Sequence, residues 1–188
     1  VLFKDVADEA IRRVLSEIAE KNPDLPEDQR QDVAMQVGMG AMAYAMLSVD
    51  NNKDIVFKIE EALSFDGHTG PYIQNAHVRA SSILRKAGEL PDNAKFDYEL
   101  AAHEIELIET ISRFPAVVQQ AANEYRPLVM ATYSFELATA FHSFYHAVPV
   151  IQADTPAIRG ARLRLVKAAQ ITLANALRLL TIRAPDVM

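Results

Sequence analysis

Apolar residues recur at helical spacing through almost the whole chain, and this period limits the fold more than any other feature of the sequence. Segments 4–20, 27–48, 71–86, 115–125, 127–147 and 156–181 each carry an apolar stripe that repeats every three or four residues. Leu100, Leu107, Ile108 and Ile111 mark a further helix that ends before Pro115. No segment alternates convincingly with the two-residue period of a strand. The sequence therefore predicts an all-α fold, a helical bundle of about seven to eight helices.

Turn-forming residues divide these helices. Turns are expected at 50–53, 64–70 and 90–93, while segment 55–63 is too short to assign to a strand or a helix. We place a domain boundary in the loop 64–70, which separates residues 1–66 from residues 67–188. Gly38 and Gly40 lie inside the helix 27–48, where each costs about 1 kcal/mol relative to alanine. They predict that another part of the chain approaches this helix closely.

The helix predicted at 71–86 carries the most distinctive polar face. Pro71 suits its first turn, and Gly88 suits its end. At about 100° per residue, one side presents an amide, a guanidinium, a hydroxyl and an ammonium group, from Asn75, Arg79, Ser82 and Lys86. Such a face suits a polyanion with base edges, although solvent exposure is the commoner reason for a polar helix face.

Positive charge gathers in the last part of the chain. The net charge of the whole sequence is −6, but residues 1–66 carry −7, residues 67–155 carry −4 and residues 156–188 carry +5. The last predicted helix has a second polar face, made of Arg164, Lys167, Asn175 and Arg178. The distribution therefore favours contact with an anion more than the total charge suggests.

Composition removes several classes of protein. The absence of cysteine excludes disulfides, thiolate nucleophiles and the usual zinc knuckles. No run of 18 apolar residues is present, so we expect no membrane-spanning helix and no membrane partner. The sequence begins at Val1 without an initiator methionine or the order of a signal peptide, so we expect a segment of a longer polypeptide.

Three histidines are candidates for ligand binding. His142 and His146 lie four residues apart on a helix, which is half of a metal-ligand arrangement. Neither a third ligand nor a carboxylate between them accompanies the pair, so packing is the favoured interpretation. His68 lies in the glycine-flanked loop 64–70, where a phosphate can approach, but we interpret it as a plain loop residue.

The acidic residues give no reason to predict catalysis. We interpret Glu104, Glu106 and Glu109 as a solvated helix face rather than as acid–base groups. The sequence also contains no nucleotide-binding glycine loop and no Gly-x-Ser-x-Gly motif. We therefore predict no catalytic residue, no metal ligand and no cofactor within this segment.

Four motifs stand out along the chain: Val37-Gly38-Met39-Gly40-Ala41 with Tyr44 and Leu47, Leu63-Ser64-Phe65-Asp66-Gly67-His68-Thr69-Gly70-Pro71-Tyr72-Ile73-Gln74, Ala76-His77-Val78-Arg79, and Asn175-Ala176-Leu177-Arg178-Leu179-Leu180 followed by Ala184-Pro185-Asp186-Val187-Met188. Together they resemble the C-terminal part of arginyl-tRNA synthetases, which are class I aminoacyl-tRNA synthetases. The last helical motif resembles the Asp-Ala-Leu-Arg stretch that names a helical anticodon-binding domain. The match covers essentially the whole chain in order.

This resemblance implies how the chain is organised and what it does. Val1 would follow the Lys-Met-Ser-Lys-Ser-type loop of the catalytic domain, residues 1–66 would be connecting helices from the end of that domain, and residues 67–188 would be the anticodon-binding domain. The parent enzyme would join arginine to its tRNA with ATP and magnesium in the cytoplasm. This fragment would lack the catalytic motifs and would bind the anticodon loop of arginine-accepting tRNA beside the catalytic domain of the same chain.

The genetic code narrows the expected contact. Every arginine codon has G in the middle, so the middle anticodon base is cytosine, which is recognised in an unstacked state through its polar edge and its ring. In the family, positions equivalent to Asn75, Arg79, Ser82 and Met188 border the anticodon. Three of them belong to the helix face described above, and Lys86, Arg164, Lys167 and Arg178 are expected to contact phosphates.

Two positions depart from the family pattern. Asn75 stands where the family often has tyrosine, so an amide replaces an aromatic stacking surface. Asn175 replaces the aspartate of the Asp-Ala-Leu-Arg motif, which removes a charge that can pair with an arginine such as Arg178. Both changes affect the pose of the loop and leave the class of ligand intact.

Two other functions remain open. The chain can be a helical interaction module whose polar faces are only solvated and whose Tyr, Phe and Met side chains contact a protein partner. A catalytic metalloprotein is the more distant alternative. Steep salt dependence together with a base preference distinguishes RNA binding from the interaction module.

Overall fold

The computed structural model describes residues 2–89 and 95–188 and builds them from eight helices. They are α1 (Phe3–Lys21), α2 (Glu27–Leu47), α3 (Ile59–Ala62), α4 (Gly70–Ala87), α5 (Ala102–Ser112), α6 (Phe114–Glu124), α7 (Pro127–Ala147) and α8 (Pro156–Leu179). The predicted all-α class is confirmed, and the bounds of the six helices predicted as ranges agree within two residues. In the described ranges, no helix combines the length and apolar character needed to cross a membrane.

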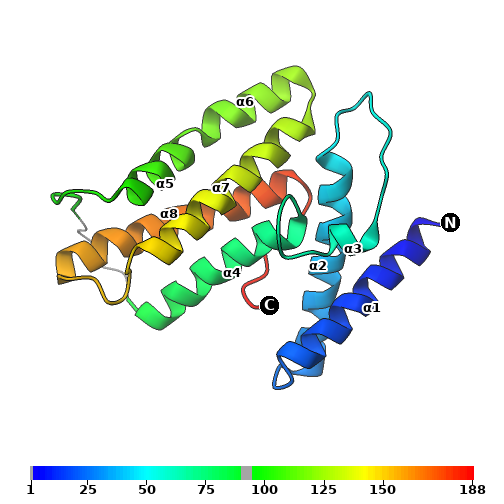
Figure 1. The fold of residues 1–188 in the computed structure, drawn as a ribbon, viewed down its shortest axis with the longest axis horizontal. Helices are drawn as coiled ribbons and strands as arrows, with labels where there is room; N and C mark the ends of the chain where they lie inside the picture. The colour runs from blue at the N-terminus through cyan, green and yellow to red at the C-terminus, as the bar shows by residue number, and fades with distance from the viewer. Residues whose placement is uncertain (1, 90–94) are drawn as a thin grey trace.

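The helices form two groups (Figure 1). α4, α5, α6, α7 and α8 run along a common direction, and α1 and α2 lie at one end of them. α1 packs against α2, α2 packs against α4, and α4 packs against both α8 and α7. α4 therefore lies between the helix pair at the start of the chain and the rest of the bundle.

α7 and α8 form the centre of the main core. The buried side chains of this core include Phe141 and Phe144 from α7, Leu173 and Leu177 from α8, and Ile73 from α4. α7 buries side chains on much of its circumference, which confirms the central, mostly buried position expected from its wide apolar face. A smaller cluster of Val14, Ile18, Val33, Ala34 and Val37 joins α1 to α2.

Glycines allow α2 to approach both of its neighbours. A Cβ atom on Gly70, at the start of α4, would lie 2.6 Å from the carbonyl oxygen of Gly40. A Cβ atom on Gly38 would lie 3.1 Å from the backbone nitrogen of Ile11 in α1. The close approach predicted at Gly38 and Gly40 is therefore confirmed, and it fixes the N-terminal end of α4 against α2.

The start of α5 differs from the expectation. The apolar spacing predicts Leu100 to mark a helix, but Leu100 precedes α5, which begins at Ala102. The reason is the Glu104 carboxylate, whose Oε2 accepts a hydrogen bond of 2.9 Å from the Ala101 backbone nitrogen and so defines the first turn. Segment 55–63, whose sequence is too short to distinguish a strand from a helix, contains the single-turn helix α3. The turn predicted at 90–93 lies outside the described residues.

Glu104 also corrects the interpretation of the acidic residues. Glu106 and Glu109 are exposed as expected, but Glu104 is 0% exposed and pairs with Arg162 of α8, with Nε and Oε1 3.1 Å apart. The Tyr98 hydroxyl donates a 2.6 Å hydrogen bond to the same carboxylate. Burial by itself raises the pKa of Glu104, but the hydrogen bonds from Tyr98, Arg162 and Ala101 outweigh it and hold the pKa below its usual value.

Candidate nucleic-acid interface

Three adjoining cavities follow the polar face of α4 and form what we call the α4 groove. The first is lined by Val14, Glu17, Ile18, Lys21, Asn22, Phe65, Asp66, Asn75, Arg79 and Met188. The second continues toward α7 along Phe65, Asp66, Tyr72, Asn75, Arg79, His103, Thr139, His142, Ser143, His146 and Ala147. The third is lined by Arg79, Ser82, Ile83, Lys86, Tyr145 and residues 148–152. Arg79 lines all three cavities and therefore lies at the middle of the groove.

The groove brings together five of the eight residues proposed from the sequence. Asn75, Arg79, Ser82 and Lys86 line it from α4, and Met188 lines it from the end of the chain. Within each turn of α4 the opposite side is buried in the core, which is why the helical spacing alone predicted this face.

The three proposed residues of α8 lie elsewhere. Arg164, Lys167 and Arg178 are not among the described residues that line the α4 groove. Lys167 connects to α4 indirectly, because its Nζ donates to Gln170 and the amide of Gln170 donates to the Ser81 hydroxyl of α4 at 2.7 Å. The polar residues predicted on α4 therefore line a groove that those predicted on α8 do not line.

Arg79 is held in place by α7. Its Nη1 lies 3.2 Å from Nδ1 of His142 and 3.3 Å from Nε2 of His146, and its Cζ lies 5.2 Å from the centre of the Tyr145 ring. His142 is buried, and burial followed by the charge of Arg79 lowers its pKa to about 4. His142 and His146 thus contact Arg79, and the described residues contain no group of three His, Cys, Asp or Glu side chains arranged to hold a metal ion.

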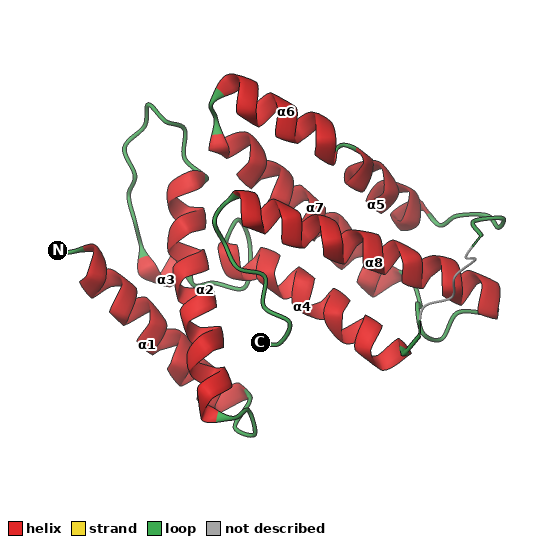
Figure 2. Cartoon of the chain, turned by 180° about the vertical axis from the view of Figure 1, so that it is seen from behind, coloured by secondary structure: helices red, strands yellow, loops and turns green. Residues whose placement is uncertain are grey.

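A second polar face of α4 binds the C-terminal segment. Figure 2 shows this segment turning back after α8 and passing over α4. Four α4 side chains contact it: the Gln74 amide donates to the Arg183 carbonyl (2.8 Å), His77 Nδ1 donates to the Pro185 carbonyl (2.8 Å), the Ser81 hydroxyl donates to the Asp186 carboxylate (3.1 Å) and Arg85 donates to the Asp186 carbonyl (2.9 Å). This face was not predicted from the sequence, although positions 74, 77, 81 and 85 have helical spacing.

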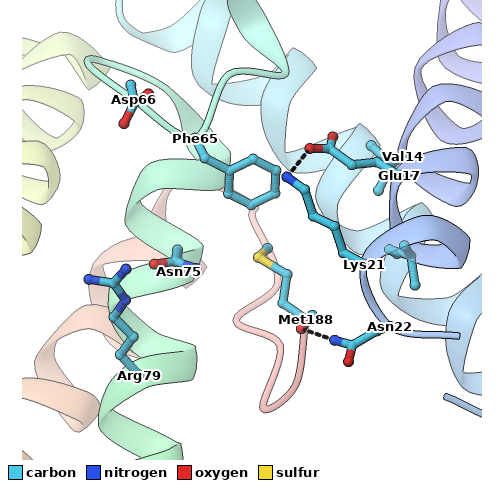
Figure 3. A pocket seen from close by; sticks show the side chains of 10 residues that line it. Val14, Glu17, Lys21, Asn22, Phe65, Asp66, Asn75, Arg79 and Met188 are labelled. Carbon is cyan, nitrogen blue, oxygen red and sulfur yellow. Dashed lines mark hydrogen bonds and ion pairs between the residues drawn. The ribbon is translucent and has the colours of Figure 1, made fainter. Parts of the chain in front are cut away.

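The end of the chain also reaches α1. The Asn22 amide donates a 3.0 Å hydrogen bond to the Met188 carbonyl, and Met188 lies between α4 on one side and α1 on the other (Figure 3). Residues from three distant parts of the chain therefore close the first cavity.

Two aromatic rings line the groove beside the loop 64–69, those of Phe65 in the loop and Tyr72 in α4. Phe65 borders the first two cavities, and Nζ of Lys21 lies 5.6 Å from the centre of its ring. Tyr72 contacts the rings of Phe135 and His142. The ring of His68 stacks on Phe135 with centroids 3.6 Å apart, so this loop residue has a packing contact. Phe65 thus offers an aromatic surface in the cavity where Asn75 offers none.

Comparison with known proteins identifies two family models. Residues 73–188 match the model described as DALR anticodon binding domain, and residues 1–59 match the model of the class I (R) tRNA synthetase catalytic domain. The arginine–tRNA ligase of Pyrococcus abyssi is 46% identical over 98% of the chain, and that of Clostridium acetobutylicum is 37% identical over 100% of it. These matches cover 30% and 33% of the respective relatives, so the chain spans about a third of their length.

Solved structures show the same arrangement of helices. Thermus thermophilus arginyl-tRNA synthetase matches 100% of this chain with a TM-score of 0.94 and 40% sequence identity, over 32% of its own length. The arginyl-tRNA synthetase of Plasmodium falciparum, at 21% identity and a TM-score of 0.86, supports the fold alone. Since the anticodon-binding model covers more than half of the sequence and the fold agrees, the chain belongs to the DALR anticodon-binding domain family.

Proposed function

We propose that this chain recognises the anticodon loop of arginine-accepting tRNA as the C-terminal part of an arginine–tRNA ligase. The α4 groove carries this proposal, because it combines a cationic side chain, hydrogen-bonding groups and an aromatic ring along one hollow surface. Membership of the anticodon-binding family and the similarity to arginine–tRNA ligases support it.

The first two cavities suit an unstacked base. Arg79 would donate to the middle cytosine or to its backbone, while Asn75, with Ser82 from the adjoining third cavity, would adjust the hydrogen bonding and Met188 would close the first cavity. Phe65 would supply the stacking surface that the family often obtains from a tyrosine at the position of Asn75. Lys86 at the far end of the groove, with Arg164, Lys167 and Arg178 on α8, would contact phosphates.

The same proposal gives a role to each part of the chain. Residues 1–66 would be the connecting helices at the end of the catalytic domain, and residues 67–188 would be the anticodon-binding domain. The two family matches end at residue 59 and begin again at residue 73, and the boundary that we propose between 66 and 67 lies in the interval that neither covers. Aminoacylation with arginine, ATP and magnesium would occur in the preceding catalytic domain, in the cytoplasm, and this segment would contribute binding.

A titration that combines salt and base identity tests the function. The full-length protein is titrated with arginine-accepting tRNA and with the same tRNA carrying a changed middle anticodon base, at several salt concentrations. We expect affinity to fall steeply with salt for both, and the cytosine tRNA to bind more tightly by about 1–3 kcal/mol. Equal affinity for the two tRNAs with little salt dependence would instead favour the interaction module.

A further inference from the structure

The guanidinium of Arg79 contacts two histidine nitrogens of α7. His142, Tyr145 and His146 lie on one side of α7, and Arg79 reaches them from α4. A guanidinium has only N–H donors and stays protonated, so both histidine nitrogens that face it must accept. His142 therefore accepts at Nδ1 and His146 at Nε2, and both rings are neutral in this arrangement.

Neutral acceptors hold a cation without cancelling its charge. The ion pairs formed within residues 2–89 and 95–188 do not include Arg79, whereas Arg162 is paired with Glu104 and Arg126 with Asp50. A carboxylate at the position of either histidine would compete with RNA for the guanidinium. The two histidines instead fix its position and leave its full positive charge in the groove.

The geometry also determines which donors remain. Both histidine contacts are made by Nη1, which has two N–H groups. Nε and Nη2 keep three N–H groups between them, and one edge of the guanidinium is enough for a bidentate contact to neighbouring acceptors. Arg79 is the described residue shared by all three cavities, so its side chain borders each of them.

We propose that His142 and His146 are positioning residues for anticodon binding: as neutral acceptors they hold Nη1 of Arg79, so that the other edge of the guanidinium is presented to RNA. This inference rests on the proposed function. By sequence, the two histidines resemble half of a metal site. Their proposed role is instead to orient the neighbouring guanidinium of Arg79. The inference also makes a specific prediction: each histidine affects RNA binding only through Arg79.

A double-mutant cycle tests whether His146 acts through Arg79. The full-length protein and its Arg79→Ala, His146→Leu and doubly substituted variants are titrated with arginine-accepting tRNA at one moderate salt concentration. We expect His146→Leu to weaken binding about 5-fold to 10-fold when Arg79 is present, and to have almost no further effect in the Arg79→Ala background. Losses that multiply independently would overturn the inference, because His146 would then act on RNA by itself.

Conservative variants separate positioning from general packing. His146→Gln places an amide oxygen near the position of Nε2, and His142→Asn does the same for Nδ1, so both should bind tRNA within about 2-fold of wild type. Gln119→Leu is the control, since Gln119 is an exposed polar residue of α6 that lies outside the three cavities of the groove. Failure of His146→Gln to restore binding lost in His146→Leu would also contradict the inference.

The outcomes distinguish this inference from the function on which it rests. If Arg79→Ala weakens binding but the cycle is additive, only the role of the histidines is wrong. If Arg79→Ala binds as wild type does, both the positioning role and the RNA contact of Arg79 are wrong. The base preference of the wild-type protein decides separately whether the anticodon is recognised at all.

Discussion

At the scale of single residues, the positive charges of Arg162 and Arg79 have different surroundings. Arg162 is neutralised by the buried Glu104, whereas Arg79 is held by uncharged acceptors in an open groove. A buried ion pair of this kind costs much to break, because the remaining charge stays away from water. The partly exposed Arg79 has no buried carboxylate partner to lose and, by our proposal, remains available to a ligand. The same side-chain type thus serves folding on α8 and, by our proposal, recognition on α4.

Replacing Glu104 tests the structural role of its ion pair. Glu104→Gln leaves Arg162, whose side chain is 11% exposed, without its carboxylate, so we expect the free energy of unfolding to fall by about 3 kcal/mol. Chemical denaturation at pH 7 measures this change, and Glu106→Gln on the exposed side of α5 is the control. Comparable losses in the two variants would show that the buried pair contributes nothing special.

The stabilising effect of Glu104 should also depend on pH. The folded pKa of Glu104 lies below its ordinary value of 4.5, so the carboxylate stabilises the fold fully above the unfolded pKa. That contribution is lost as the pH falls through the lower, folded pKa. The difference in stability between wild type and Glu104→Gln should therefore shrink in acid, as denaturation curves at a series of pH values would show.

At the scale of helices, the contact between α2 and α4 depends on the absence of side chains. In Gly70→Ala the new Cβ would lie 2.6 Å from the Gly40 carbonyl oxygen, and because that atom belongs to a helix backbone it cannot move away alone. We expect a loss of about 1–3 kcal/mol in the free energy of unfolding, measured by denaturant titration. Gly38→Ala, whose nearest atoms lie at 3.1 Å, should lose less. An unchanged denaturation midpoint for Gly70→Ala would contradict this account.

The C-terminal segment links α4 to α1, and this link can be weakened at an exposed residue. Asn22→Ala removes the hydrogen bond to the Met188 carbonyl without disturbing the core. We expect the Met188 methyl resonance to narrow and tRNA affinity to fall by about 2-fold to 5-fold, since the first cavity loses its closing side chain. With only six methionines in the chain, methyl NMR can resolve this signal.

Asn52→Ala serves as the control for that experiment, because it removes an exposed amide outside the groove. A Met188 resonance that keeps its width in Asn22→Ala would show that contacts on α4 hold the end of the chain without help from α1.

At the scale of the whole molecule, the parts that could be predicted from sequence are those set by local rules. Helical periodicity together with proline and glycine gave the bounds of α7 closely, and it identified the face of α4 that carries Asn75 and Arg79. The buried position of Glu104 could not be predicted, because it depends on Arg162, 58 residues further along the chain. The contacts of Arg79 with α7 and of α4 with the C-terminal segment also join residues more than 60 positions apart.

The route of the C-terminal segment has a consequence for protein synthesis. The hydrogen bonds of Pro185, Asp186 and Met188 reach back 101 to 166 residues, to α4 and to Asn22. Since a chain emerges from the ribosome N-terminus first, α1, α2 and α4 are exposed long before these partners exist. The first cavity of the groove is therefore completed only when residues 185–188 have emerged. A nascent chain from which only α1 to α7 have emerged would have most of its helices but could not yet close this cavity around a base.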